Sequence, residues 1–341
     1  MGPSIKIDDS FAQSVGIDIS KERFTACVCM SDRKGNHQHS EVREYANNKT
    51  GFNQFTKWVR KCVLKGHPCH YVMEATGIYH EKLAYHLWKL NFDVVVVLPS
   101  RSKKYAEYNA FRTKTDKVDS IMLSELGCSD TRLNLWSPPI PVYRKLKQLE
   151  RLLWDLKKHR TRMKNNLEAL QHSESPTSEV VKEYKRLVDG IDRSIERTEG
   201  QIHYVLGCDA NIKEDVRRLM TILAVGLVSA VTVLAETQGF HMISNRKQLA
   251  SFAGLDAKAR ESGTQNPRRR LSKQGNVRIR GALYMPALVA ASKNPELKAD
   301  YENIVQRNQS RKKVAVIAVE RKLLLLMYTL WKKGEDYKEQ K

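Results

Sequence analysis

The spacing of hydrophobic positions separates the first part of the chain from the rest. Up to about residue 138, short apolar runs alternate with segments in which apolar residues recur every three or four positions. Short runs are typical of buried strands and the longer spacing of amphipathic helices, so the alternation predicts an α/β layer fold over 1–138. The predicted strands cover 14–20, 24–30, 42–46, 70–74 and 92–98. The predicted helices cover 52–64, 79–90 and 116–126.

The pattern becomes helical throughout from 139 to 206. Leucine, isoleucine and valine recur there with three- and four-residue spacing on both sides of a polar stretch at 172–178. This pattern predicts two long helices that fold back on each other as an antiparallel coiled-coil hairpin.

The remaining region, 207–331, is also predicted to be mostly helical, with a polar and basic stretch at 256–270. Residues 332–341 are polar and are expected to form a frayed tail. The fold class is therefore α/β plus all-α. The predicted helices of this last region cover 216–235, 246–252, 277–291 and 312–331.

The charge of the chain adds to this fold an expected class of binding partner. Its 341 residues include 59 lysines and arginines against 38 aspartates and glutamates, a net charge of +21. Such an excess favours a polyanionic partner, most commonly nucleic acid, over mere solubility. The excess is strongest over 206–341, which holds 25 basic and 13 acidic residues.

A basic stripe on the first hairpin helix is a candidate for phosphate contact. Residues 144–164 contain nine basic and two acidic side chains. With so few acids nearby in the sequence, a nucleic-acid-facing stripe is favoured over a merely solvated helix face. Arg144, Arg151 and Lys158 are the candidates chosen from it.

The sequence also bears on location. It has no apolar run of about 18 residues that would span a membrane, and its N-terminus has no apolar core of a secretory signal. None of the six cysteines forms a Cys-x-x-Cys pair, which favours reduced core thiols. We therefore expect a protein of a bacterial-type cytosol, associated with the nucleoid and not with a membrane.

Four carboxylates form a candidate metal site. Asp18 lies inside a predicted apolar strand, where a charge costs free energy unless it is paired or binds a metal. Glu74 ends a second strand, and Asp116 and Asp119 share one face of a predicted helix. Together they could hold two Mg²⁺ ions for phosphoryl transfer. Alternatively, Asp116 only caps its helix and Asp119 is simply exposed.

These elements and acids resemble a known family. Their order, strand Asp, strand Glu and helix Asp-x-x-Asp, is similar to the RuvC type of ribonuclease-H-like fold. The strings around them resemble the Asp-Glu-Asp-Asp transposases of the insertion-sequence-110 type, whose four acids bind the catalytic metal, Mg²⁺ or possibly Mn²⁺. The strings lie at 16–21, 74–79 and 114–119.

The C-terminal region carries the second half of the resemblance. The strings at 252–255, 260–264, 271–276 and 280–287 are similar to the transposase domain of the same family. The serine of its Glu-Ser-Gly string is the nucleophile, which places that role on Ser262. Basic side chains around it would hold the attacked phosphate. They are Arg260, Arg268, Arg269, Arg270 and Lys273.

The resemblance further implies how such an enzyme works. The metal-bound acids of one subunit act with the serine domain of another, so the protein would be a homo-oligomer, a dimer or a tetramer. A covalent serine–DNA intermediate allows strands to be rejoined without a high-energy cofactor. A structured noncoding guide RNA, called a bridge RNA, would pair with donor and target DNA. One departure is the sequence at 222–226, where relatives often have a glycine-rich turn of helix-hairpin-helix type.

Other interpretations stay open at this point. A RuvC-like nuclease or junction resolvase would use water in place of Ser262. A DNA invertase would use the same chemistry as a transposase. A non-enzymatic nucleic-acid-binding protein would keep the basic surface without strand cleavage, although the presence of all four acids argues against it.

Overall fold

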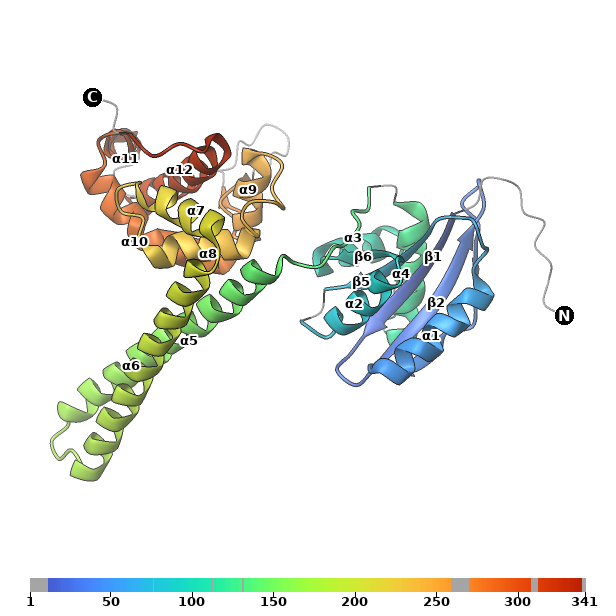
Figure 1. Cartoon of the computed structure of the whole chain (residues 1–341), viewed down its shortest axis with the longest axis horizontal. Helices are drawn as coiled ribbons and strands as arrows, with labels where there is room; N and C mark the ends of the chain where they lie inside the picture. The colour runs from blue at the N-terminus through green and yellow to red at the C-terminus, as the bar shows by residue number, and fades with distance from the viewer. Residues whose placement is uncertain are drawn as a thin grey trace. The chain divides into compact units, whose positions relative to one another are not determined.

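The chain folds into two compact units, the first ending at Pro138 and the second beginning at Pro139 (Figure 1). The computed structural model describes a set of ranges within the full chain. These are 12–75, 77–111, 113, 115–130, 132–258, 270–307 and 312–338.

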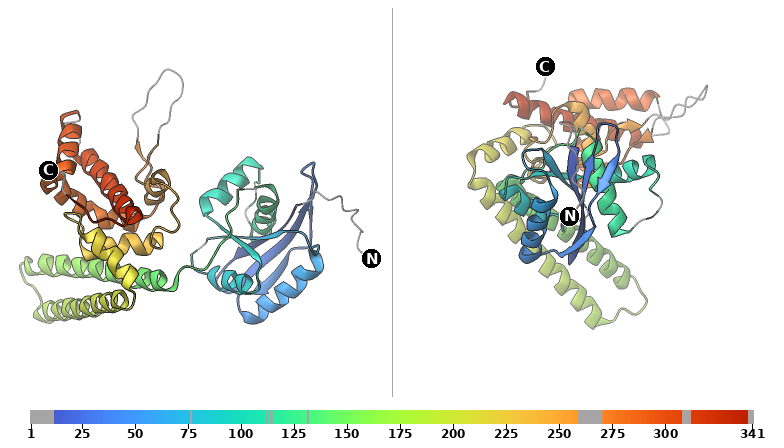
Figure 2. Two further views of the ribbon diagram at one scale, coloured as in Figure 1. Left: turned by 45° about the horizontal axis from the view of Figure 1, so that its top comes forward. Right: turned by 90° about the vertical axis from the view of Figure 1, so that its right-hand side faces the viewer.

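The first unit is a mixed sheet with helices on both faces (Figures 1 and 2). Its strands are β1 (Ala12–Ile19), β2 (Arg23–Ser31), β3 (His37–His39), β4 (Arg43–Ala46), β5 (Cys69–Glu74) and β6 (Asp93–Val97). Its helices are α1 (Lys49–Cys62), α2 (Glu81–Lys89), α3 (Pro99–Tyr108) and α4 (Asp116–Ser129).

The strand order is β3-β2-β1-β5-β6, and β4 also pairs with β2. Strand β1 is antiparallel to β2 and parallel to β5, which in turn is parallel to β6. Alternate side chains of each strand therefore face opposite sides. Val15 and Ile17 pack with α1 and α2 on one face, while Val72 and Val95 pack with α4 on the other. The predicted α/β layer fold of this region is confirmed.

Two elements of this unit are absent from the sequence prediction. Strand β3 is only three residues long and polar, so it has no apolar run. Helix α3 has the sequence PSRSKKYAEY and buries only Ser102 among its residues, so it lacks the apolar stripe on which the prediction depends. Its start is fixed by Pro99 at the first helical position.

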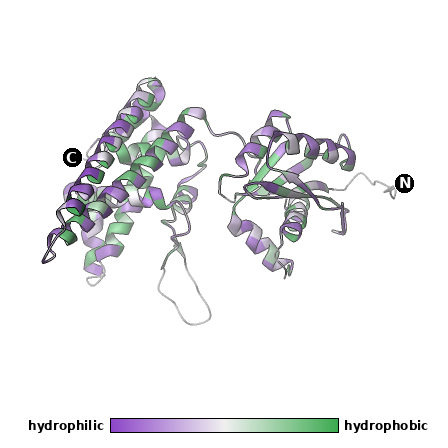
Figure 3. Cartoon of the chain, turned by 90° about the horizontal axis from the view of Figure 1, so that it is seen from below, coloured by the Kyte–Doolittle hydropathy of each residue, from purple (hydrophilic) through white to green (hydrophobic). Residues whose placement is uncertain are grey.

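The second unit is helical. Its helices are α5 (Pro141–Gln171), α6 (Ser178–Gly207), α7 (Ala210–Met220), α8 (Leu227–Thr237), α9 (Arg246–Ala253), α10 (Val277–Lys293), α11 (Pro295–Arg307) and α12 (Lys312–Lys333). Two short strands, β7 (Ala257–Lys258) and β8 (Arg270–Leu271), pair antiparallel. The helices carry both hydrophobic and hydrophilic residues, as expected where one face is buried (Figure 3).

Helices α5 and α6 form the predicted antiparallel hairpin (Figure 1). Its base does not stand apart from the helices that follow. Leu146 and Leu153 of α5 and Ile202 of α6 belong to the same hydrophobic core as residues of α8, α10 and α12. The hairpin is therefore anchored at one end in the helical core of the unit.

The structure differs from the sequence prediction in four places within this unit, one of which is the unpredicted pair of strands β7 and β8. The helix expected at 216–235 is two helices, because the chain leaves helical geometry between Met220 and Leu227 and Ala224 has a φ of 81°. Helix α11 was not predicted. The expected frayed tail is ordered through Tyr337, whose amide donates to Thr221 Oγ1 at 2.8 Å and whose hydroxyl accepts from Asn294 Nδ2 at 2.9 Å.

No helix in the described ranges combines the length and apolar character that a membrane span requires.

Candidate active site

The candidate site is built where α4 crosses β1 at backbone contact. A Cβ atom on Gly16 would lie 2.0 Å from the carbonyl oxygen of Ser120 and 2.2 Å from the amide nitrogen of Ser124. Gly16 is therefore required because a side chain there would push the helix away. The close approach brings the first turn of α4, with Asp116 and Asp119, to the end of β1 that carries Asp18.

A single hydrogen bond fixes the start of α4 beside Asp18. Thr25 on β2 lies directly opposite Asp18 in the antiparallel register, and its Oγ1 donates to the carbonyl oxygen of Asp116 at 2.8 Å. Thr115 caps the helix by accepting from the amide of Val118 at 3.3 Å. Two acids in the first turn also interact favourably with the helix dipole. The sequence interpretation of Asp116 as only a cap does not hold, since Thr115 has that role.

Glu74 lies beside Asp18 at the end of the neighbouring parallel strand. Ile17 pairs with Met73 in the β1–β5 register, so the two acids are the next positions along each strand. Ser102 of α3 donates to Glu74 Oε2 at 2.5 Å and holds the carboxylate from the other side.

All four predicted acids line one cavity of about 680 Å³. Asp18, Glu74 and Asp119 are half-buried there, and Asp116 is exposed. However, in the part of the chain that is described, no three His, Cys, Asp or Glu side chains lie close enough to hold one ion between them. The four carboxylates thus share a cavity without converging on a point.

Helix α3 supplies the wall of the cavity that the sequence interpretation missed. Ser102, Lys103 and Glu107 all line it, and Lys103 Nζ lies 3.9 Å from Glu107 Oε1. The signal in the sequence was weak because α3 has no apolar periodicity. The polar string after a buried strand and Pro99 is the only indication of a helix at this edge of the sheet.

Most of the predicted serine site cannot be compared with the structure. Arg260, Ser262, Arg268 and Arg269 lie outside the described residues, and of Arg270 only the backbone in β8 is described. The described residues that flank them are held together by hydrogen bonds. Ser272 Oγ donates to the Asp256 carboxylate, and the amide of Lys273 donates to the carbonyl oxygen of Gly254 at 3.2 Å.

The comparisons with known proteins decide the family. A model of Asp-Glu-Asp-Asp transposases of IS110 type matches residues 15–176, and a model described as transposase IS116/IS110/IS902 family matches residues 216–302. The chain belongs to the IS110-type transposases. It is therefore a DNA transposase or recombinase, as the sequence interpretation expected.

Two curated relatives of the chain, a gene-inverting protein and a transposase, are similar to it over different lengths. The transposase is 28% identical over 330 residues to the pilin gene-inverting protein of Moraxella bovis, covering 95% of this chain and 97% of that one. It is 28% identical over 135 residues to the transposase of insertion sequence element IS1111A of Coxiella burnetii, covering 38% of this chain and 36% of that one.

Among solved structures, a Ppx/GppA family member of Aquifex aeolicus aligns over 96% of this chain and 92% of its own. The sequence identity is 10% and the TM-score is 0.23. A likeness this low carries no argument about the fold.

The basic stripe of the transposase makes more contacts within its own unit than the sequence suggests. Arg151 Nε and Nη2 donate to the two carboxylate oxygens of Glu236 at 2.8 and 3.1 Å, and Lys147 lies 3.2 Å from the same carboxylate. Further along α5, two more basic side chains pair with acids of α6. These pairs are Lys157–Glu199 at 2.8 Å and Arg160–Asp192 at 3.0 Å.

The acidic partners of these α5 side chains lie on α6 and α8, so counting charges along α5 alone does not reveal them. Of the three candidates chosen from the stripe, Arg151 is therefore engaged with Glu236, Arg144 is half-buried and Lys158 is exposed. Lys158 is the one whose position best suits contact with a polyanion.

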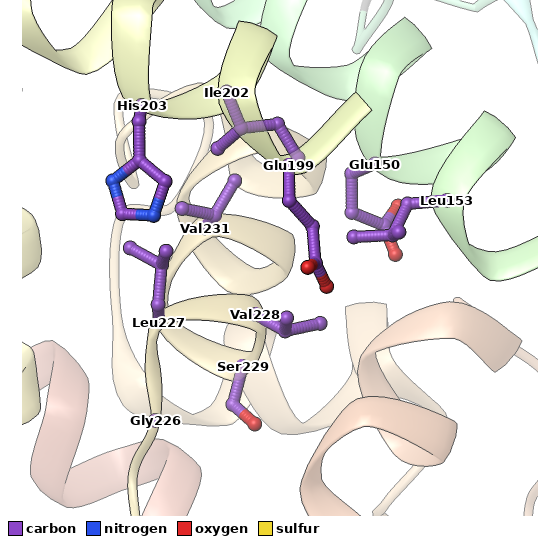
Figure 4. Close-up of a pocket in the computed structure, with 10 residues that line it drawn as sticks. All are labelled: Glu150, Leu153, Glu199, Ile202, His203, Gly226, Leu227, Val228, Ser229 and Val231. Atoms are coloured by element: carbon purple, nitrogen blue, oxygen red, sulfur yellow. The ribbon is translucent and has the colours of Figure 1, made fainter. Parts of the chain in front are cut away.

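A second cavity lies at the base of the hairpin between α5, α6 and α8 (Figure 4). It has a volume of about 310 Å³, and the carboxylates of Glu150 and Glu199 reach into it. Burial raises the pKa of Glu150, which keeps one hydrogen bond from Thr232 at 3.1 Å. Two acids and an apolar lining do not suit a nucleic-acid phosphate, so this cavity is not a candidate for substrate.

Proposed function

We propose that this transposase cleaves and rejoins DNA strands through a covalent Ser262–DNA intermediate, assisted by Mg²⁺ at Asp18, Glu74, Asp116 and Asp119. The single observation that supports it most is the gathering of these four acids on one cavity from β1, β5 and α4. All four acids also lie within residues 15–176, the range that the transposase family model matches.

The sheet of the first unit supports the finer description as a RuvC or ribonuclease-H-like domain. That fold places a catalytic acid on the central strand, with an antiparallel hairpin on one side and parallel strands on the other. Strand β1 carries Asp18, pairs antiparallel with β2 and parallel with β5. We propose this assignment from the strand order and the family motif together.

The donor set fits a hard divalent cation, Mg²⁺ or Mn²⁺, because it consists of carboxylate oxygens. When bound, such an ion would stabilise charge on the phosphate oxygens during strand transfer. The protein's own part is to hold the ligands in place. Ser102 orients Glu74, Thr25 fixes the start of α4, and Lys103 on the same cavity wall can balance the negative charge.

The proposed step at Ser262 exchanges one ester for another. The Oγ atom forms a bond to the DNA phosphorus, the bond from phosphorus to the deoxyribose oxygen breaks, and the serine proton goes to the departing hydroxyl. The bond energy is kept in the phosphoserine ester, so reversal by a new DNA hydroxyl rejoins strands. Arg260, Arg268, Arg269, Arg270 and Lys273 are proposed to bind the phosphate.

The family resemblance supports two further parts of the proposal. A structured noncoding RNA pairs with donor and target DNA, and the acids and serine of one active site come from different subunits of a dimer or tetramer. Since the Moraxella relative is a pilin gene-inverting protein by name, inversion of a DNA segment is a proposed outcome alongside transposition.

The test is capture of the covalent intermediate. Purified protein with its co-purified RNA, DNA and Mg²⁺ should give a protein–DNA adduct that survives denaturation. Ser262→Ala should abolish it, whereas the control Ser251→Ala, an exposed serine of α9, should keep it. Strand cleavage that persists in Ser262→Ala would instead indicate a nuclease that uses water. Sequencing the co-purified RNA tests the guide, which should match DNA flanking the gene.

A further inference from the structure

A basic cleft lies in the second unit between the start of α9 and the end of α12. It has a volume of about 710 Å³. Its lining consists of Ser244, Asn245, Arg246, Lys247, Tyr328, Thr329, Lys332 and Lys333. Four of these side chains are cationic and none is acidic.

The floor of the cleft is held firmly. Arg246 Nη2 donates to Thr329 Oγ1 at 2.9 Å, which links α9 to α12. Asn245 caps α9 by accepting from the amide of Gln248 at 2.9 Å. Tyr328 is buried, and its ring packs against Phe240 at a centroid distance of 5.4 Å. The basic groups therefore surround a fixed hollow and not a loose loop.

Among the described residues, the charges of the cleft are only partly balanced. One of its four cations forms an ion pair there: Lys333 lies 3.8 Å from Glu335, and both side chains are more than half exposed. An exposed pair at this distance contributes little. Helix α9 has no acid in its first turn, so its dipole adds positive potential at the same place. Four cations held at one hollow repel one another, and an anion there would relieve that repulsion.

The cleft is the opposite of the cavity in Figure 4, where Glu150 and Glu199 would repel an anion. It also lies on the element that leads to the proposed serine segment. Helix α9 ends at Ala253, the chain turns at Gly254 with a φ of 69°, and β7 follows. Eight residues of helix measure about 12 Å, so the cleft is roughly one short helix away from the base of the β7–β8 hairpin.

We propose that this cleft binds the phosphodiester backbone of a nucleic-acid strand. Lys247, Lys332 and Lys333 contact phosphate oxygens, and Arg246 together with the hydroxyl of Thr329 fixes the position of the strand. A polyanion that follows α9 from this cleft would be led toward the base of the β7–β8 hairpin. The binding itself depends neither on Ser262 as nucleophile nor on a metal, so it goes beyond the proposed function.

The test measures binding of the full chain to two labelled probes, a short DNA duplex and a structured RNA. EDTA is present throughout because it prevents metal-dependent cleavage. Lys247→Gln/Lys332→Gln is compared with Lys293→Gln/Lys313→Gln, exposed lysines of α10 and α12 outside the cleft lining with the same change in charge. Fluorescence anisotropy is recorded over a range of salt concentrations. Thermal unfolding confirms that both variants fold as the parent does.

The cleft variant should have a salt slope less negative by nearly 2, since each phosphate contact contributes about 0.9 on duplex DNA. Its Kd should rise at least about tenfold, and the control should match the parent. If the cleft variant loses affinity for the DNA duplex alone, or for the structured RNA alone, that probe is the nucleic acid that occupies the cleft. Equal slopes for the two variants on both probes would overturn the proposal. Because no strand is cut, failure of the Ser262 chemistry leaves this result unaffected.

Discussion

Acidic side chains lie among apolar residues in both units, but the two units treat them differently. In the helical unit, the fully buried carboxylate of Glu236 accepts from Arg151 and from Asn276 Nδ2 and lies 3.2 Å from Lys147. In the α/β unit, four acids gather on the wall of one open cavity. The first arrangement ties helices together, whereas the second keeps carboxylate oxygens accessible. Burial of an acid is thus no guide to function until its partners and its access to solvent are known.

The pKa values follow the same contrast. Burial alone would raise the pKa of Glu236, but the hydrogen bond from Arg151 and the charge of Lys147 lower it below its ordinary value. Glu320 on α12 is equally buried and has no hydrogen-bond partner at Oε1 in the described structure. Burial raises the pKa of Glu320 to about 7, and the charge of Arg280 offsets this only in part. Paired acids stabilise the helical unit as anions, and Glu320 does so only when protonated.

The largest effect is expected from removing an acid of the open cavity. Asp18→Asn should lower strand cleavage on the order of 10³-fold, because a metal ligand supplies several kcal/mol of transition-state stabilisation. The free energy of unfolding should be unchanged or slightly raised, because the repulsion between the neighbouring carboxylates is reduced. The measurement is the rate of DNA cleavage in Mg²⁺. Glu107→Gln, which lines the same cavity outside the predicted metal set, is the control. Equal losses in the two variants would contradict the assignment.

The paired acid of the helical unit should behave in the opposite way. Glu236→Ala should lower the free energy of unfolding by about 3 kcal/mol, because Lys147 and Arg151 lose their buried partner. Both cations can still reach water, so the loss lies at the lower end for buried pairs. Chemical denaturation measures it. Glu199→Ala, which breaks the half-exposed pair with Lys157, should cost about 1 kcal/mol or less. A small effect of Glu236→Ala would show that the pair is not structural.

Glu320 should make the stability of the helical unit depend on pH. Its pKa is raised from 4.5 to about 7 in the folded protein, so its contribution to stability is complete below about pH 4.5 and is lost as pH rises through 7. Glu320→Gln should therefore stabilise the protein at pH 8 by about 3 kcal/mol and have little effect at pH 4.5. Unfolding of both proteins at the two pH values tests this. A difference that does not change with pH would refute it.

The sequence was sufficient to predict the positions of the four acids that line one cavity, and insufficient for the contacts of the basic stripe. Asp18, Glu74 and the two acids of α4 occupy strand ends and a helix start that short-range patterns reveal. Gly16 could have indicated the close helix approach, but only the structure shows that α4 is what approaches. Arg151 looked unpaired because its partner, Glu236, is 85 residues away along the chain.

The same limit explains α3 and the cleft. Helix α3 packs against the core through Tyr105 and Ala106, and polar contacts such as Ser102 with Glu74 also hold it. Two adjacent apolar residues make no repeating stripe, so periodicity could not predict this helix. The basic cleft combines the start of α9 with the end of α12, two segments joined only by tertiary packing. Local patterns predict elements that bury their own apolar face. They do not predict sites formed between distant segments.

The smallest effect is expected from a residue that orients a proposed metal ligand but does not itself bind the metal. Ser102→Ala removes the hydroxyl that donates to Glu74 Oε2 at 2.5 Å and leaves the carboxylate in place. Cleavage in saturating Mg²⁺ should fall about tenfold, because a second partner of a metal ligand typically contributes 10- to 100-fold. The apparent affinity for Mg²⁺ should weaken, and Ser102→Thr should restore much of it. A loss as large as that of Asp18→Asn would mean that Ser102 contacts the reacting groups, whereas an unchanged Mg²⁺ dependence would mean that Glu74 needs no such support.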